Sequence, residues 1–317
     1  MGLLGKLAVA ALVLGGAGAV GFWLLTAAQQ LDAETIAALG TGDAKRGERM
    51  FRAAGCASCH ARPKAVGAAA LELAGGLELA TPFGVFVAPN ISPDPNDGIG
   101  SWTVEDFANA MLNGVAPDGS HLYPAFPYPS YTRMKSGDVA DLYAYLKTLP
   151  PVAGRTAEHR LAFPYNIRRG LGLWKLLYLS DEPVVALAPD ASEQARHGQY
   201  LVEGPGHCGE CHTPRDFAGG LKTGEWLAGA VAAEGKGNVP NITSGEGGIS
   251  WSQNDIAYFL ESGFTPDFDS VGGSMVDVQR NTALLPAEDR QAIAAYLKAV
   301  PPRPNGYPAA PTAAPAN

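Results

Sequence analysis

The chain has 317 residues and a formal net charge of −8, with 31 acidic against 23 basic side chains. This balance argues against a nucleic-acid-binding protein, because no basic stripe is available to neutralise phosphates. The length predicts about two domains, and 39 glycines with 25 prolines favour loop-rich domains over long regular elements.

The N-terminal segment is predicted to span a membrane. Residues 7–26 contain no charged side chain, and a helix of this length matches the ~30 Å hydrocarbon core of a bilayer. A secretory signal usually has a shorter apolar region of ~7–15 residues and a clear cleavage site, whereas Thr26-Ala27-Ala28 is a poor one. We therefore expect residues 1–30 to form an uncleaved anchor, with Lys6 on the cytoplasmic side and the rest of the chain outside.

All four cysteines of the chain lie in two C-x-x-C-H motifs. Cys56-Ala57-Ser58-Cys59-His60 recurs as Cys208-Gly209-Glu210-Cys211-His212. This motif is typical of covalent haem c attachment, in which the two thiols bond the porphyrin vinyl groups and the histidine ligates the iron. A bare C-x-x-C also suits a redox dithiol or half of a zinc site, but the histidine that follows in both copies favours haem. The sequence thus predicts two covalently bound haem c groups, held by Cys56, Cys59 and His60 and by Cys208, Cys211 and His212.

The first motif lies in a predicted helical domain over residues 42–152. Capping residues, apolar periodicity and glycine or proline stops define its helices, and the loops between them are long. The helices are expected over residues 42–52, from the Thr103 and Asp106 capping box to Gly114, and from a Ser136 cap to Leu149.

The second half repeats this plan in the same order, which indicates duplication. Pro89-Asn90-Ile91-Ser92 recurs as Pro240-Asn241-Ile242-Thr243, and Trp102 recurs as Trp251 before the next helix. The two asparagines also fit the glycosylation sequon, but their place in the repeat favours a role in loop structure. We expect a second haem domain over residues 191–303, a linker over residues 153–190 and a disordered Pro/Ala-rich tail over residues 304–317.

The sixth iron ligand decides between electron transfer and chemistry at the iron, because a protein ligand closes the site that a substrate would need. Met275 is the candidate at the second haem, since it follows Gly272-Gly273-Ser274 in a loop that lets its thioether reach the iron. Met50 lies on the wrong side of its motif, and Met111 is better explained by packing on a helix face.

The first haem has no methionine at the corresponding place, because the repeat puts Phe126 opposite Met275. Met134, immediately before the last helix of the domain, is the next donor, although it also matches Leu285 as a core residue. His121 is a further candidate ligand, and a solvated turn residue is an equally good interpretation of it. Met134, His121 and no protein ligand therefore stay open, with Met134 favoured.

Several segments of the chain carry a resemblance to a known family. Among them are Asn90 to Asp94 (N-I-S-P-D), Gly98 to Trp102 (G-I-G-S-W), Asp118 to Tyr128 (D-G-S-H-L-Y-P-A-F-P-Y), Phe163 to Arg168 (F-P-Y-N-I-R) and Trp174 to Leu177 (W-K-L-L). From about Gly42 to Pro302 the chain resembles the cytochrome c subunits of membrane-bound bacterial alcohol, aldehyde and gluconate dehydrogenases. The resemblance implies a periplasm-facing electron-transfer subunit, although those subunits usually carry three haems and many have Met where Phe126 stands.

We therefore expect an all-α protein of two tandem class I-like cytochrome c domains with long loops, behind one N-terminal transmembrane helix. It is expected in the bacterial inner membrane with its haem domains in the periplasm. There it relays electrons from a membrane-bound or periplasmic dehydrogenase subunit to a quinone or terminal oxidase. No motif supplies other chemistry, so by itself the chain is not expected to be an enzyme. The alternative is a dihaem enzyme of the peroxidase or thiosulfate dehydrogenase type, with the first haem reactive.

Overall fold

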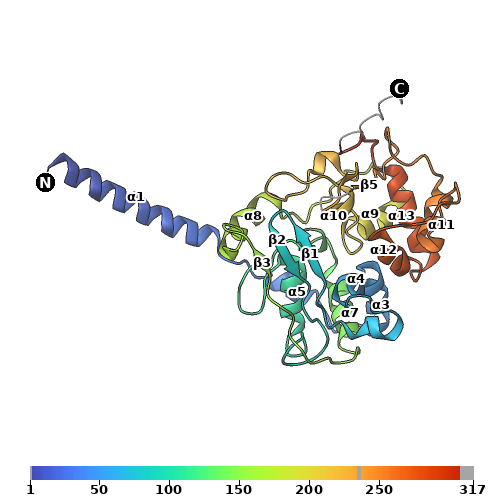
Figure 1. The fold of residues 1–317 in the computed structure, drawn as a ribbon, viewed down its shortest axis with the longest axis horizontal. Coiled ribbons are helices and arrows are strands. Elements are labelled where there is room, and N and C mark those ends of the chain that lie inside the picture. Colours follow the sequence, from blue (N-terminus) through green and yellow to red (C-terminus); the bar gives the residue numbers. More distant parts are fainter. Residues whose placement is uncertain (1, 234–236, 308–317) are drawn as a thin grey trace, which may run out of the picture.

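The computed structural model describes residues 2–233 and 237–307, and Figure 1 shows a two-part body from which one long helix projects. This helix, α1 (Leu3–Leu25), is long and apolar enough to cross a membrane, a test that a signal sequence also passes. We call residues 31–152 the first half and residues 183–307 the second half. Each half has its own hydrophobic core.

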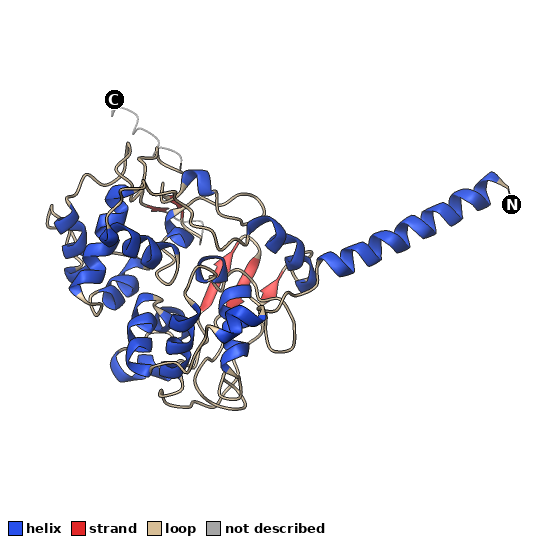
Figure 2. Cartoon of the chain, turned by 180° about the vertical axis from the view of Figure 1, so that it is seen from behind, coloured by secondary structure: helices blue, strands red, loops and turns tan. Residues whose placement is uncertain are grey.

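The described residues contain mostly short helices joined by loops (Figure 2). The first half contains α2 (Ala33–Ala37), α3 (Ala44–Ala53), α4 (Cys56–His60), η1 (Gly67–Glu72), α5 (Val104–Asn113), α6 (Tyr128–Tyr131) and α7 (Ser136–Leu146). The connecting segment contains η2 (Arg168–Gly170) and α8 (Leu171–Tyr178). The second half contains α9 (Glu193–Glu203), α10 (Gly209–His212), η3 (Thr223–Glu225), α11 (Gln253–Ser262), α12 (Met275–Thr282) and α13 (Ala287–Ala299).

Each half is organised by a close crossing of two helices, α3 with α7 and α9 with α13. A glycine makes each crossing possible. A Cβ atom on Gly47 would lie 1.9 Å from the Asp141 carbonyl oxygen, and one on Gly198 would lie 1.8 Å from that of Ala292. Because no side chain fits at either place, the two glycines allow the backbones to touch, and the crossing is the same in both halves.

The helix that follows Trp102 and the helix that follows Trp251 begin with the same kind of cap. Thr103 and Asp106 form a capping box at the start of α5, as expected, and Ser252 with Asp255 forms another at the start of α11. Both helices end at a glycine in the left-handed conformation, α5 at Gly114 and α11 at Gly263. The expected Ser136 cap is wrong, because the N-cap position of α7 is Lys135 and no side chain bonds there.

The all-α expectation needs correction, because two small antiparallel sheets are present. The first contains β1 (Glu78–Thr81), β2 (Gly84–Val87) and β3 (Arg160–Leu161), and the second contains β4 (Ala230–Val231) and β5 (Asn238–Val239). Thr81 pairs with Gly84, so Pro82 and Phe83 form the hairpin turn between β1 and β2. A Cβ atom on Gly84 would lie 2.3 Å from the Arg160 carbonyl oxygen, which explains why glycine stands where β3 pairs.

Candidate haem sites

Each C-x-x-C-H motif forms a single helical turn. Cys56 to His60 are α4, and Cys208 is the N-cap residue of α10. The residue before the first cysteine has a positive φ in both motifs, +56° at Gly55 and +38° at His207. This left-handed residue ends the preceding segment and starts the new turn, so the two thiols of a motif lie one turn apart on the same side.

The two motif histidines make the same hydrogen bond through Nδ1. The Nδ1–H of His60 donates to the Pro89 carbonyl oxygen at 2.9 Å, and that of His212 donates to the Pro240 carbonyl oxygen at 2.8 Å. Burial lowers the pKa of both imidazoles, which favours their neutral form. Because the proton sits on Nδ1, the Nε2 lone pair of each ring is left for a metal, and the backbone carbonyl fixes the ring orientation.

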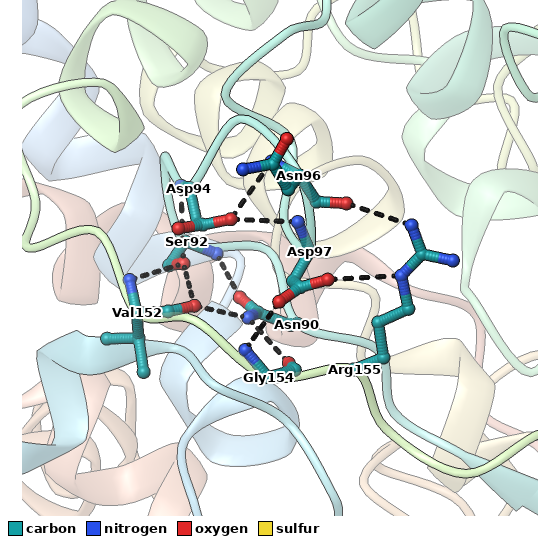
Figure 3. A network of polar contacts seen from close by, with 8 residues as sticks. All are labelled: Asn90, Ser92, Asp94, Asn96, Asp97, Val152, Gly154 and Arg155. Atoms are coloured by element: carbon teal, nitrogen blue, oxygen red, sulfur yellow. Dashed lines mark hydrogen bonds and ion pairs between the residues drawn. The ribbon is translucent and has the colours of Figure 1, made fainter.

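An asparagine next to each of these prolines holds the carbonyl in place. Asn90 donates from Nδ2 to the carbonyl oxygens of Val152 and Gly154 at 2.7 and 3.0 Å, and its Oδ1 accepts from the Ser92 amide at 2.8 Å (Figure 3). Asn241 repeats the arrangement with the Arg303 carbonyl oxygen at 2.9 Å and the Thr243 amide at 2.9 Å.

Both asparagines are buried, so their side chains shape the loops, as the repeat predicted, and are not accessible for glycosylation. Sequence analysis missed their link to the histidines. The repeated P-N-I-S/T pattern was the available signal.

The first thiol of each motif is partly buried against the apolar core of its half. Burial raises the pKa of the Cys56 and Cys208 thiols to about 12. Among residues 2–233 and 237–307, no three His, Cys, Asp or Glu side chains cluster as a metal site. Each motif offers what haem c takes, which is two thiols and one imidazole nitrogen beside an apolar core.

The predicted sixth ligands occupy different environments. Met275 is the first residue of α12, not a loop residue, and it packs partly buried against the core that also contacts Cys208. Met134 is fully enclosed in the first core, which contacts Cys56, and its counterpart Leu285 is a core residue of the second half. Met111 is also part of the first core, as expected from its helix face.

Phe126, which stands opposite Met275 in the repeat, and His121, the further candidate ligand of the first haem, lie in different surroundings. Phe126 packs partly buried on the first core, with its ring 5.5 Å from that of Tyr131. His121 is buried, so its interpretation as a solvated turn residue is wrong. Its Nε2 lies 2.9 Å from the carbonyl oxygen of Thr26, just beyond the end of α1, so the imidazole links the first half to the N-terminal helix.

Both motifs lie at the contact between the two halves. Asn281 donates from Nδ2 to the Ser58 hydroxyl at 3.1 Å, and Ser130 donates from its hydroxyl to Glu210 at 2.7 Å. Ser58 and Glu210 are the third residues of their motifs, while Ser130 and Asn281 each stand four positions before Met134 or Leu285. The two contacts are therefore equivalent, and each C-x-x-C turn touches the opposite half.

A second group of contacts lies at the same junction. His207, which precedes Cys208, approaches the Ala54 carbonyl oxygen to 3.2 Å with Nε2 and has its ring 5.6 Å from that of Tyr131. Ala54 lies two residues before Cys56. The segments that lead into the two motifs are thus in direct contact.

Comparison with known proteins agrees with this geometry. A protein described as "Diheme cytochrome c-type" from Cereibacter sphaeroides is 55% identical over 90% of this chain and 94% of its own length. This chain belongs to the dihaem c-type cytochromes. The cytochrome c family profile matches residues 44–150, the part that contains the first motif. As a c-type cytochrome, the protein carries haem c.

Two further relatives are subunits of dehydrogenases. The cytochrome c subunit of the quinone alcohol dehydrogenase of Gluconobacter oxydans is 37% identical over 90% of this cytochrome, which spans 61% of that subunit. The cytochrome c subunit of gluconate 2-dehydrogenase of Pantoea cypripedii is 36% identical over 81% of this cytochrome and 59% of its own length. The expected resemblance to alcohol and gluconate dehydrogenase subunits is confirmed, although this cytochrome covers only about three fifths of those two relatives.

Proposed function

We propose that this dihaem cytochrome relays electrons between a partner dehydrogenase and a membrane acceptor. One haem is assigned to Cys56, Cys59 and His60 and the other to Cys208, Cys211 and His212, in tandem class I-like domains over residues 42–152 and 191–303. The observation that carries the proposal is that each C-x-x-C turn contacts the opposite half, Ser58 through Asn281 and Glu210 through Ser130. Because both attachment turns lie at the contact between the halves, their cofactors are held at the same junction, as a relay requires.

In this proposal Met275 and Met134 are the sixth ligands. Haem supplies one-electron chemistry when bound, and a methionine thioether raises its potential relative to a second histidine. Met275 and Cys208 both pack against the second core, and Met134 lies in the core that also contacts Cys56. Each thioether therefore belongs to the same apolar cluster as the first cysteine of its motif.

The donor is proposed to be a membrane-bound or periplasmic dehydrogenase subunit, and the acceptor a quinone or terminal oxidase. Support comes from relatives that are named as cytochrome c subunits of dehydrogenases. The cytochrome domains are placed on the periplasmic side of the bacterial inner membrane, behind α1.

Contacts at the end of α1 support its role as a retained anchor. Thr26 is completely buried, its carbonyl oxygen is bound by His121, and its hydroxyl accepts from Arg169 Nε at 2.8 Å. A retained α1 keeps these contacts, whereas cleavage after Ala28 would remove them.

A second function is favoured by one observation. The position of Met134 in the first half corresponds to Leu285, which is a buried core residue in the second half. If Met134 also serves only in packing, the first haem has an open position, and the protein is a dihaem enzyme of the peroxidase or thiosulfate dehydrogenase type.

Magnetic circular dichroism of the isolated full-length protein tests the two functions. The relay predicts two low-spin haems, each with a charge-transfer band between a thioether and iron, and no reaction with hydrogen peroxide. One high-spin haem that binds peroxide in the unmutated protein contradicts the relay and supports the enzyme.

A further inference from the structure

An exposed apolar surface lies on the segment that connects the two halves. We call it the linker patch, and its residues are Phe163, Tyr165, Ile167, Leu173, Leu176 and Leu177. Leu173, Leu176 and Leu177 have the spacing that places side chains on one side of the α8 helix. Leu177 is 76% exposed, and apolar residues gathered on a protein surface commonly mark an interaction site.

The remainder of α8 is fixed to the body of the protein. Trp174 donates from Nε1 to the Ala218 carbonyl oxygen at 2.9 Å, and Lys175 donates from Nζ to the Asn113 and Gly114 carbonyl oxygens at 2.6 and 2.7 Å. The helix is therefore held by one face while leucines cover the other. An exposed apolar face on a helix held in this way is free to bind a partner or a membrane.

The α8 helix, which carries the three leucines of the linker patch, lies next to the end of α1 (Figure 1). A Cβ atom on Gly172 would lie 2.5 Å from the Thr26 Cα atom, so α8 packs directly on the residue that ends α1. The Arg169 guanidinium lies 4.1 Å from the centre of the Trp23 ring and binds the Trp23 carbonyl oxygen. Exposed residues of the last turn of α1 thus lead into the patch: they are Trp23, Leu24 and Leu25.

The charge of the segment suits a lipid surface. Residues 160–180 contain no acidic residue, in a chain with a net charge of −8. Of their basic side chains, Arg160 pairs with Glu78 and Lys175 is turned toward the body of the protein, which leaves Arg168 and Arg169 as the cations just before α8. Anionic headgroups therefore meet no carboxylate from this segment. Tryptophan and tyrosine, present here as Trp23 and Tyr165, are enriched at membrane interfaces because their rings have an apolar body and a polar atom.

We propose that the linker patch lies in the interfacial layer of the bilayer that α1 spans, as a second membrane contact of this cytochrome. The inference rests on the proposed anchoring role of α1 and goes further, because it fixes how the haem domains are oriented above the membrane. A single helix leaves the attached domains free to rotate and tilt. A helix and a lateral apolar patch that meet at Thr26 define a plane, so the same face of the protein is always turned toward lipid.

Spin labelling of the full-length holoprotein in vesicles of phosphatidylcholine with phosphatidylglycerol tests the proposal. A nitroxide is attached to one added cysteine at a time: Leu14→Cys in the middle of α1, Leu177→Cys in the patch, and Phe268→Cys in the second half. Phe268 is the matched control, because its apolar side chain is 94% exposed and belongs to the other half. Mass spectrometry of each denatured variant checks that both haems are attached. Collision of the label with oxygen, compared with a water-soluble nickel chelate, then measures its depth.

The proposal predicts that labels at positions 14 and 177 collide preferentially with oxygen and that the label at position 268 collides preferentially with the nickel chelate. Leu176→Cys, at a neighbouring exposed position, provides a second probe if the label disturbs position 177. Lipid access at 14 with water access at 176 and 177 overturns the second contact and leaves the anchor intact. Water access at 14 overturns both. Labels at 176 and 177 that face water in vesicles but are shielded in native membranes show that a partner protein covers the patch, and also overturn the lipid proposal.

Discussion

Arg49 and Tyr200 occupy equivalent positions in the two repeats, and each binds an aspartate of the opposite half. Arg49 Nε lies 2.6 Å from an Asp289 carboxylate oxygen, and the Tyr200 hydroxyl donates to Asp138. Asp138 and Asp289 are the third residues of α7 and α13. The exchange therefore follows an approximate two-fold relation, the same one that pairs Ser58 with Asn281 and Ser130 with Glu210.

The Arg49 contact is predicted to contribute the larger part of the stability of this junction. Asp289 is completely buried, and removing one partner of a fully buried ion pair typically costs about 3–5 kcal/mol. The lower end of this range applies here, because Arg49 is partly exposed and His197 Nε2 also lies 2.7 Å from the Asp289 carboxylate. We expect Arg49→Met to lower the free energy of unfolding by about 3 kcal/mol and Tyr200→Phe by about 1 kcal/mol, the value of an ordinary hydrogen bond. Urea unfolding followed by circular dichroism measures both.

Arg280→Met is the control for this prediction. Arg280 and Asp277 form an exposed pair three residues apart, 3.2 Å between Nη1 and the carboxylate, and such pairs contribute about 0–1 kcal/mol. If Arg49→Met has no larger effect than Arg280→Met, the buried pair does not hold the halves together.

The Asn90 network is predicted to tune the first haem through His60. Asn90→Ala removes the bonds that position the Pro89 carbonyl oxygen, and a weaker acceptor for Nδ1–H makes the imidazole a weaker base. A less basic ligand stabilises ferric iron less, so the potential of that haem should rise while the other stays unchanged. Spectroelectrochemical titration measures the two potentials. Asn96→Ala is the matched control, since Asn96 enters the same network through its backbone (Figure 3).

Three methionine variants test the ligand assignment. Met275→Ala and Met134→Ala should each open one haem to carbon monoxide and lower its potential, because the axial ligand is a main determinant of haem potential, over a range of ≈ 0.8 V across ligand types. Met111→Ala should leave both spectra unchanged and reduce stability by about 2–5 kcal/mol, the usual cost of truncating a buried methionine. Carbon monoxide difference spectra measure the opening. A Met134→Ala protein that differs from wild type only in stability assigns Met134 to packing and leaves the first haem without this ligand.

The sequence predicted the parts of the fold that depend on side-chain identity at fixed spacing. The C-x-x-C-H motifs, the Thr103 and Asp106 capping box and the stop at Gly114 are local patterns, and the structure contains all of them. The hydrogen bond from His60 to the Pro89 carbonyl oxygen could not be predicted, because every residue has a backbone carbonyl and the sequence does not show which one accepts.

The contacts between the halves could not be predicted from the sequence for a different reason. The two-fold relation pairs unlike residues, arginine with tyrosine at positions 49 and 200 and serine with glutamate at positions 58 and 210. Comparison of the two repeats therefore shows no common pattern at these positions, although they are equivalent in the structure. The residue at each of these positions suits its partner in the opposite half, so local sequence patterns do not indicate the contact.

The junction between α1 and the first half is predicted to weaken as the pH falls. His121 is buried against Thr26, and burial lowers its pKa, as do the positive charges of Lys175, Arg169 and Arg168. A histidine with a lowered pKa in the folded state binds fewer protons there than in the open state. The junction is therefore most stable above the ordinary histidine pKa of about 6.5 and loses stability as the pH falls below that value.

Hydrogen exchange of the backbone amides of residues 25–31, measured between pH 5 and 8 and corrected for intrinsic rates, tests this prediction. In the wild type, protection should decrease below about pH 6.5, the ordinary pKa of histidine. His121→Gln keeps an N–H donor for the Thr26 carbonyl oxygen but does not titrate, so its protection should be independent of pH over this range. His159→Gln is the control, because that imidazole is also a partly buried one with a lowered pKa but accepts from the Val87 amide in the first sheet. Equal pH dependence in wild type and His121→Gln would show that another group controls the junction.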